Sequence, residues 1–129
     1  MNINEMNTYA DDEGISVDIV LNSFGHNSVQ IIYLESYDYD EKMKQDINYI
    51  LSHQVKIYGI IEAEIVSYIS RVYKNNLHDF ELMKIYIFPD VESEFGFLFR
   101  WSGDTEHGIG IKLNKLSIKK IGSSEIAFM

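Results

Sequence analysis

Residues 94–113 read EFGFLFRWSGDTEHGIGIKL, and the first half of this stretch alternates between aromatic and small or polar side chains. Aromatic residues occupy every second position from Phe95 to Trp101. Successive side chains of a strand point to opposite sides of the pleat, so these aromatics share one face of a β-strand. So much apolar surface on one face predicts a central strand that covers a core. Residues 102–105 have the composition of a turn, and residues 107–113 are predicted to return as a second strand.

Further strands are predicted on both sides of this pair, over residues 15–21, 29–34, 82–88 and 116–121. A helix is predicted to begin with a capping box formed by Asp38 and Glu41, and apolar residues then recur at helical spacing as far as Val72. One bent helix of about 35 residues would be unusual in a domain of this size. Two helices separated near His53 and Gln54 are therefore favoured.

The element order ββααββββ predicts an α+β fold. We expect a mostly antiparallel sheet of about six strands, with two helices packed on one of its faces. The chain has 129 residues, which is the size of one domain with one hydrophobic core. Residues 1–129 are therefore predicted to form a single globular domain.

Several kinds of site find no support in the composition. The chain has no cysteine, and its four histidines do not show the spacing of metal ligands. It contains neither a glycine-rich dinucleotide motif nor a phosphate-binding loop. We therefore expect no cofactor and no metal. Residues 1–7 do not resemble a secretory signal, and no stretch approaches the roughly 18 apolar residues of a membrane span, so a soluble, cytoplasmic protein is expected.

The net charge is −9, and it is unevenly distributed. Residues 112–129 carry four lysines and one glutamate, a net of +3, whereas residues 1–111 carry seven basic and nineteen acidic residues, a net of −12. An acidic body argues against nucleic acid as a partner and suits a basic protein partner. Solubility alone is an equally good explanation. The candidate contact residues are the acids of three polar segments, namely Asp11, Asp12, Glu13, Asp38, Asp40, Asp90, Glu92 and Glu94.

The turn after Trp101 carries the most polar cluster of the C-terminal half. His107 is flanked by Asp104 and Glu106, a combination that could act as a general acid and base. A hydrogen-bonded turn is favoured over catalysis, because carboxylates and imidazole commonly bond to turn backbone and no nucleophile motif is present. Gly108 and Gly110 are predicted to share one strand face, where they allow Trp101 or a helix to approach closely.

The same cluster resembles a bacterial domain family of unknown function that carries a C-terminal W-D-x-E-H-G-x-G signature, followed by a strand that ends in I-G. The matching residues are Trp101, Asp104, Glu106, His107, Gly108 and Gly110, and then Ile121 and Gly122. This chain departs from the signature by inserting Ser102 and Gly103 after the tryptophan. The family resembles immunity proteins of bacterial polymorphic-toxin and contact-dependent inhibition systems.

The resemblance implies a protein that binds and neutralises a cognate toxin domain by occlusion, without catalysis. It carries no catalytic residue over to this chain. Two alternatives stay open. One is a small enzyme that uses His107 with Asp104 or Glu106, and the other is a protein-interaction module whose partner is not a toxin.

Overall fold

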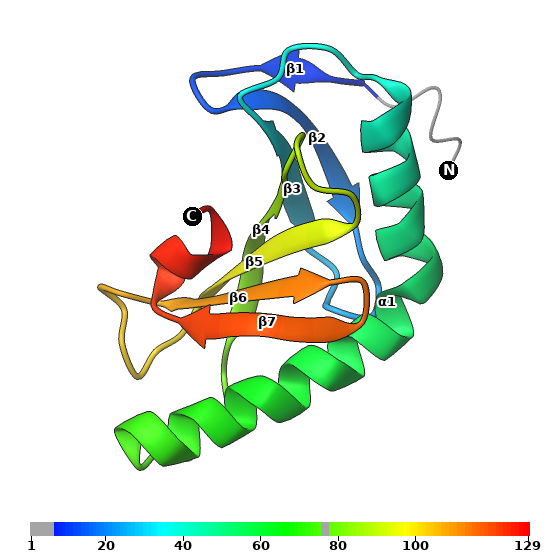
Figure 1. Cartoon of the computed structure of the whole chain (residues 1–129). Helices are drawn as coiled ribbons and strands as arrows, with labels where there is room; N and C mark the ends of the chain where they lie inside the picture. Colours follow the sequence, from blue (N-terminus) through cyan, green and yellow to red (C-terminus); the bar gives the residue numbers. More distant parts are fainter. Residues whose placement is uncertain (1–6, 76–77) are drawn as a thin grey trace.

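A computed structural model describes residues 7–75 and 78–129 (Figure 1). The strands are β1 (Tyr9–Ala10), β2 (Gly14–Val20), β3 (Ser28–Leu34), β4 (Glu81–Ile87), β5 (Glu94–Arg100), β6 (Ile109–Asn114) and β7 (Ser117–Gly122). The helices are α1 (Glu41–Tyr68), its π-helical continuation η2 (Ile69–Tyr73) and the short 3-10 helix η3 (Ser124–Ala127). The α+β class is confirmed.

The seven strands form one sheet in which spatial order equals chain order, from β1 to β7. All neighbours are antiparallel except β3 and β4, which run parallel. Helix α1 connects these two strands, because a parallel pair needs a long crossover. The predicted count of about six strands was wrong. It missed β1, since two exposed residues in a polar lead-in carry no alternation that a sequence pattern could show.

The prediction of two helices was also wrong, because the helical segment is one continuous helix. Figure 1 shows that this helix changes direction part-way and wraps around the sheet. His53 and Gln54 do not break it. Gln54 occupies the apolar stripe between Ile50 and Ile57, where its Oε1 accepts a hydrogen bond from the Ser23 backbone N–H at 3.1 Å and its Nε2 donates to the Leu51 carbonyl. A polar residue that bonds to the β2–β3 loop therefore replaces one apolar contact without ending the helix.

The start of the helix also differs from the sequence prediction. Asp40, rather than Asp38, is the N-cap, and its carboxylate accepts a hydrogen bond from the Met43 backbone N–H at 2.9 Å. Such a cap satisfies one of the amide groups that the first helical turn leaves without a partner.

The core lies between α1 and the face of the sheet that carries the aromatic side chains of β5. Phe95 and Phe97 are fully buried and Phe99 is 2% exposed, which confirms that this strand is central. The alternating residues of the neighbouring strands join them, and Ile31 and Ile32 of β3 are both fully buried. Both faces of β3 are therefore covered at these two residues.

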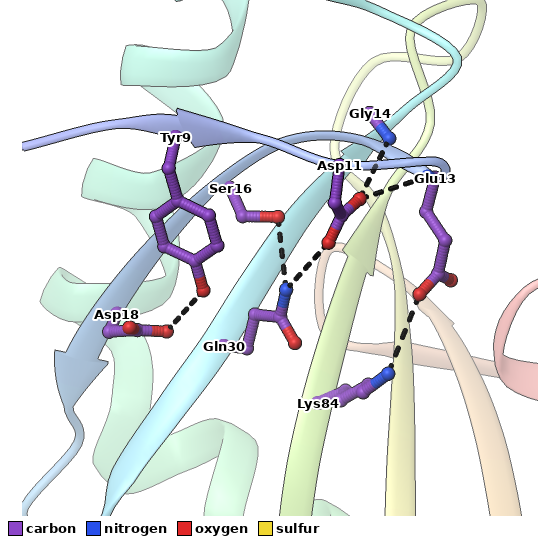
Figure 2. Close-up of polar contacts among 8 residues, drawn as sticks. All are labelled: Tyr9, Asp11, Glu13, Gly14, Ser16, Asp18, Gln30 and Lys84. Atoms are coloured by element: carbon purple, nitrogen blue, oxygen red, sulfur yellow. Dashed lines mark hydrogen bonds and ion pairs between the residues drawn. The ribbon is translucent and has the colours of Figure 1, made fainter.

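The opposite face of the sheet is covered only in part, by the C-terminal segment. A methyl group added at Gly96 would lie 1.6 Å from the Ala127 carbonyl oxygen, and one added at Gly110 would lie 2.6 Å from the Ser123 carbonyl oxygen. Glycine at these positions lets the backbone of η3 lie directly on β5 and β6. Elsewhere on this face, Ser16, Asp18, Gln30 and Lys84 present polar side chains (Figure 2). Ile32 of β3 and Tyr86 of β4 are buried there and pack in one cluster with Ala127.

Candidate partner-binding site

Three acidic segments of the sequence meet at one end of the sheet. The strand register places Gly14 beside Leu34, Tyr33 beside Ile87, and Ile87 beside Phe95. The β1–β2 turn, the β3–α1 loop and the β4–β5 turn therefore share this end. Residues 11–13, 35–41 and 88–94, which we call the acidic end, hold ten of the twenty acidic residues and no lysine or arginine.

The β1–β2 turn uses two of its three acids for local structure (Figure 2). The Asp11 carboxylate accepts hydrogen bonds from the backbone N–H groups of Glu13 and Gly14, at 2.9 and 3.3 Å, and from the Gln30 side chain at 3.4 Å. The Glu13 carboxylate lies 3.5 Å from the ammonium of Lys84 on β4. These contacts hold the turn against the polar face of the sheet.

Two other predicted contact residues also have structural roles. Asp40 caps α1 and accepts a hydrogen bond from the Tyr33 hydroxyl at 3.1 Å. Burial, followed by this bond to Asp40, raises the pKa of Tyr33 to about 12. Glu94 is buried at the start of β5, and its carboxylate lies 3.5 Å from the Lys119 ammonium. A partner would therefore reach Glu94 less readily than the other acids, whereas Asp40 stays exposed.

The remaining four predicted contact residues are Asp12, Asp38, Asp90 and Glu92, and all four are exposed. They come from all three segments of the acidic end, so the fold gathers charges that are up to 80 positions apart in the sequence. Exposed charges of one sign on neighbouring loops create a field that attracts an oppositely charged protein. The role of these four residues in binding stays a prediction.

A pocket of about 370 Å³ opens at the acidic end. Its apolar part is formed by the ends of β3 and β4, the β4–β5 turn and the C-terminal residues, while its polar part comes from three acids and one lysine. The lining residues are Leu34, Glu35, Phe88, Pro89, Asp90, Val91, Glu94, Lys112, Phe128 and Met129. An apolar pocket with an acidic rim is suited to a side chain that is both long and cationic.

A partly buried ion pair supports the base of the acidic end. The Lys42 ammonium lies 2.7 Å from the Asp46 carboxylate and donates a hydrogen bond to the Phe88 carbonyl at 2.7 Å. Burial raises the pKa of Asp46, and the bond to Lys42 opposes that shift. The pair thereby fastens the first turns of α1 to the β4–β5 turn, which carries Asp90 and Glu92.

The turn that contains the family-like signature lies at the opposite end of the sheet. Residues 101–108, which we call the Trp101 turn, connect β5 to β6. Trp101 is fully buried, and its indole packs edge-on against the Tyr73 ring with a centroid distance of 4.9 Å. The Tyr73 hydroxyl donates a hydrogen bond to the Asp104 carboxylate at 2.9 Å. Contacts with Tyr73 thus attach the turn to the end of η2.

Asp104 organises the polar part of the Trp101 turn. Its carboxylate accepts a hydrogen bond from the His107 backbone N–H at 3.0 Å and lies 3.0 Å from the Nδ1 atom of the same residue. The backbone hydrogen bond lowers the pKa of Asp104, and the side-chain bond to Asp104 raises the pKa of His107. The predicted hydrogen-bonded turn is present. The imidazole of His107 contacts the carboxylate of Asp104, whereas Glu106 is exposed to solvent.

The two glycines of the signature do not share a strand face, so that prediction was wrong. Strand β6 begins only at Ile109, and Gly108 belongs to the turn with a φ of 62°. Gly110 does permit a close approach, but its neighbour is the backbone at Ser123 and Ser124 rather than Trp101 or the long helix. The inserted Gly103 is the residue that lies against the indole, since a methyl group there would be 2.2 Å from a ring carbon of Trp101.

A second, polar hollow of about 400 Å³ lies near the Trp101 turn and is lined by Asp79, Glu81, Arg100, Ser102 and Thr105. The Arg100 guanidinium and the Glu81 carboxylate form an ion pair at 2.5 Å within it. Asp104, Glu106 and His107 are not among its lining residues.

Compared with known proteins, the chain matches no family model, no curated protein and no solved structure. Within residues 7–75 and 78–129, no group of three or more metal-ligating side chains is placed to hold a metal ion. No helix in those ranges is long and apolar enough to cross a membrane.

Sequence reasoning found the acids but missed the pocket beside them. Phe88, Lys112 and Phe128 come from three different elements, and nothing in their local patterns links them. The one available signal was the glycine at position 96. A glycine in the middle of an aromatic strand indicates that another backbone lies on it, and here that backbone is the C-terminal segment that walls the pocket.

Proposed function

We propose that this protein is an immunity-type protein that binds a basic bacterial toxin domain through its acidic end and neutralises the toxin by occlusion. The observation that carries the proposal is the convergence of ten acids, with no lysine or arginine among them, in three segments at one end of the sheet. An apolar pocket lies within this surface, which supports a docking site with both a charged and an apolar component. Action on such a toxin inside the producing cell places the protein in the cytoplasm.

The contacts of His107 support a role without catalysis. The Asp104 carboxylate accepts hydrogen bonds from the backbone and the side chain of His107, and it accepts a further hydrogen bond from the Tyr73 hydroxyl. This is the bonding pattern of a structural turn, and the nearby hollow is lined by other residues. A general base must reach its substrate within hydrogen-bonding distance, so an enzyme would need a binding cleft on His107 itself.

The test is a co-expression assay with the toxin domain encoded directly upstream. Cells that produce both proteins should survive, and the two proteins should co-purify. The variant Asp12→Asn/Asp38→Asn/Asp90→Asn/Glu92→Gln should lose most of this protection. Its matched control removes four acids away from the acidic end, with Glu64→Gln/Asp79→Asn/Glu106→Gln/Glu125→Gln, and should protect as the native protein does.

Survival without co-purification, or protection that needs His107 rather than the acids, would contradict the proposal. If the upstream product is not toxic but still binds the acidic end, the protein is the alternative interaction module. That outcome would confirm the acidic end as the binding surface but would show that the partner is not a toxin.

A further inference from the structure

The pocket at the acidic end already holds one cation of the chain itself. The Lys112 ammonium lies 4.4 Å from the centroid of the Phe88 ring, within the range of a cation–π interaction. The same ammonium contacts the Met129 carbonyl oxygen. Lys112 thus shows where a positive group fits between the aromatic wall and the C-terminal segment.

The charges that line the pocket exceed what Lys112 neutralises. Glu35, Asp90 and Glu94 face one lysine, and Glu94 is also paired with Lys119. Glu35 and Asp90 are exposed at the rim, on two different loops. A cation that took the place of the Lys112 ammonium would therefore meet the Phe88 ring in a pocket whose lining also includes three carboxylates.

We propose that this pocket binds an arginine side chain of the protein partner, with the guanidinium taking the place of the Lys112 ammonium over Phe88. The inference rests on the proposed function and names the contact that anchors the partner. The pocket volume of about 370 Å³ and its apolar walls suit the aliphatic stem of the arginine. Lys112 acts as an internal competitor that keeps the ring covered when the partner is absent.

Arginine fits this chemistry better than other ligands. A planar guanidinium stacks on an aromatic ring and bonds carboxylates in pairs, whereas an ammonium acts as a point charge. An anion would face a net negative lining. The Phe128 side chain, which is 44% exposed and packs against Tyr86 with a centroid distance of 5.4 Å, provides a second aromatic surface at the pocket wall.

The experiment is an NMR titration of the whole protein with the peptide acetyl-Gly-Arg-Gly-amide, and with acetyl-Gly-norleucine-Gly-amide as the uncharged control. The arginine peptide should shift the amide signals of Leu34, Glu35, Asp90 and Val91 in a saturable way. It should bind at least about fivefold more tightly than the norleucine peptide, as expected for a cation–π contact beside carboxylates. Equal binding of the two peptides, or shifts confined to other parts of the protein, would overturn the inference.

Three variants sharpen the test. Phe88→Leu keeps an apolar wall and removes the aromatic face, and Asp90→Asn removes one rim charge, so each should weaken arginine binding by about threefold to tenfold. Lys112→Met removes the competitor and should strengthen it by about twofold to fivefold. Asp12→Asn, which lies outside the pocket lining, is the matched control and should change nothing. Weaker binding by the Lys112→Met variant would show that this lysine is part of the site, which also overturns the inference.

The titration involves no toxin, so its outcome is independent of the co-expression assay. If the arginine peptide does not bind in the pocket while the variant without the four acids still loses protection, the inference fails and the proposed function stands. If the peptide binds as described but the upstream protein does not, the proposed function fails and the arginine pocket stands.

Discussion

The two ends of the sheet use their polar side chains in different ways. At the Trp101 turn, Asp104 bonds inward to Tyr73 and His107, and Trp101 beneath it is fully buried. At the acidic end, exposed carboxylates such as Glu35 and Asp90 line an open pocket. Both ends contain turns rich in acids, so composition alone does not distinguish them.

The difference shows that a polar cluster must be judged by what its groups contact. A carboxylate that accepts several hydrogen bonds within its own turn stabilises the fold, and its removal leaves donors without partners. A carboxylate that faces solvent costs little to remove and is available to another protein. Substitutions at the Trp101 turn should therefore change stability, and substitutions at the acidic end should change binding.

The largest effect is expected from Trp101→Ala. The indole is fully buried and packs against Tyr73, so truncation leaves a large cavity and should lower the free energy of unfolding by about 3–5 kcal/mol. Urea denaturation measures the loss, and Trp101→Phe, which fills part of the space, should lose less. A loss well below about 1 kcal/mol would mean that the packing of the Trp101 turn does not stabilise the fold as the comparison requires.

Gly96→Ala tests the segment that links the two ends. The added methyl group would collide with the Ala127 carbonyl, so η3 must move and the free energy of unfolding should fall by about 1–3 kcal/mol. The control is Gly59→Ala, where the new methyl group meets open space on α1 and should be neutral or stabilising. Thermal unfolding of both variants gives the comparison, and equal melting temperatures for the two would contradict the packing of η3 on β5.

Association kinetics test the acidic end. Asp12→Asn/Asp38→Asn/Asp90→Asn/Glu92→Gln should leave the free energy of unfolding within about 0.5 kcal/mol of the native value, because these side chains are exposed. It should slow association with the basic partner by about tenfold at low salt, and by less at high salt where the charges are screened. Stopped-flow measurements at two ionic strengths give both rates. A slowdown that does not depend on salt would contradict steering by charge.

The sequence was sufficient for the parts of the fold that repeat locally. Alternation identified the aromatic strand and its buried face, and helical spacing identified the stripe that packs on it. It was insufficient where one residue acts through a distant partner. Gln54 suggests a helix break in the sequence, but in the structure it accepts a hydrogen bond from Ser23 within a continuous helix. Strand β1 forms only because it pairs with β2.

The candidate site divides in the same way. The acids are visible in the sequence, but their meeting at one end depends on the parallel pairing of β3 and β4 across the long helix. That pairing is set by tertiary packing, not by any local pattern. The pocket depends further on η3 folding back onto Gly96, which joins residues about 30 positions apart.

The smallest expected effect is a pH dependence at the Trp101 turn. The bond to Asp104 raises the pKa of His107 above its ordinary value of 6.5 in the folded protein. A group whose pKa is higher in the folded than in the unfolded state stabilises the fold fully below the unfolded value, and this contribution disappears as the pH rises through the folded value. His107→Gln should therefore lower the melting temperature slightly more at about pH 5.5 than at about pH 8.5. The imidazole is exposed, so solvent screens the pair and the difference should be small.

Partner binding by this variant should be unchanged, because the acidic end lies at the other end of the sheet. An equal change at both pH values would mean that the ion pair with Asp104 adds nothing, and a loss of binding in a fully folded variant would move the functional surface to the Trp101 turn.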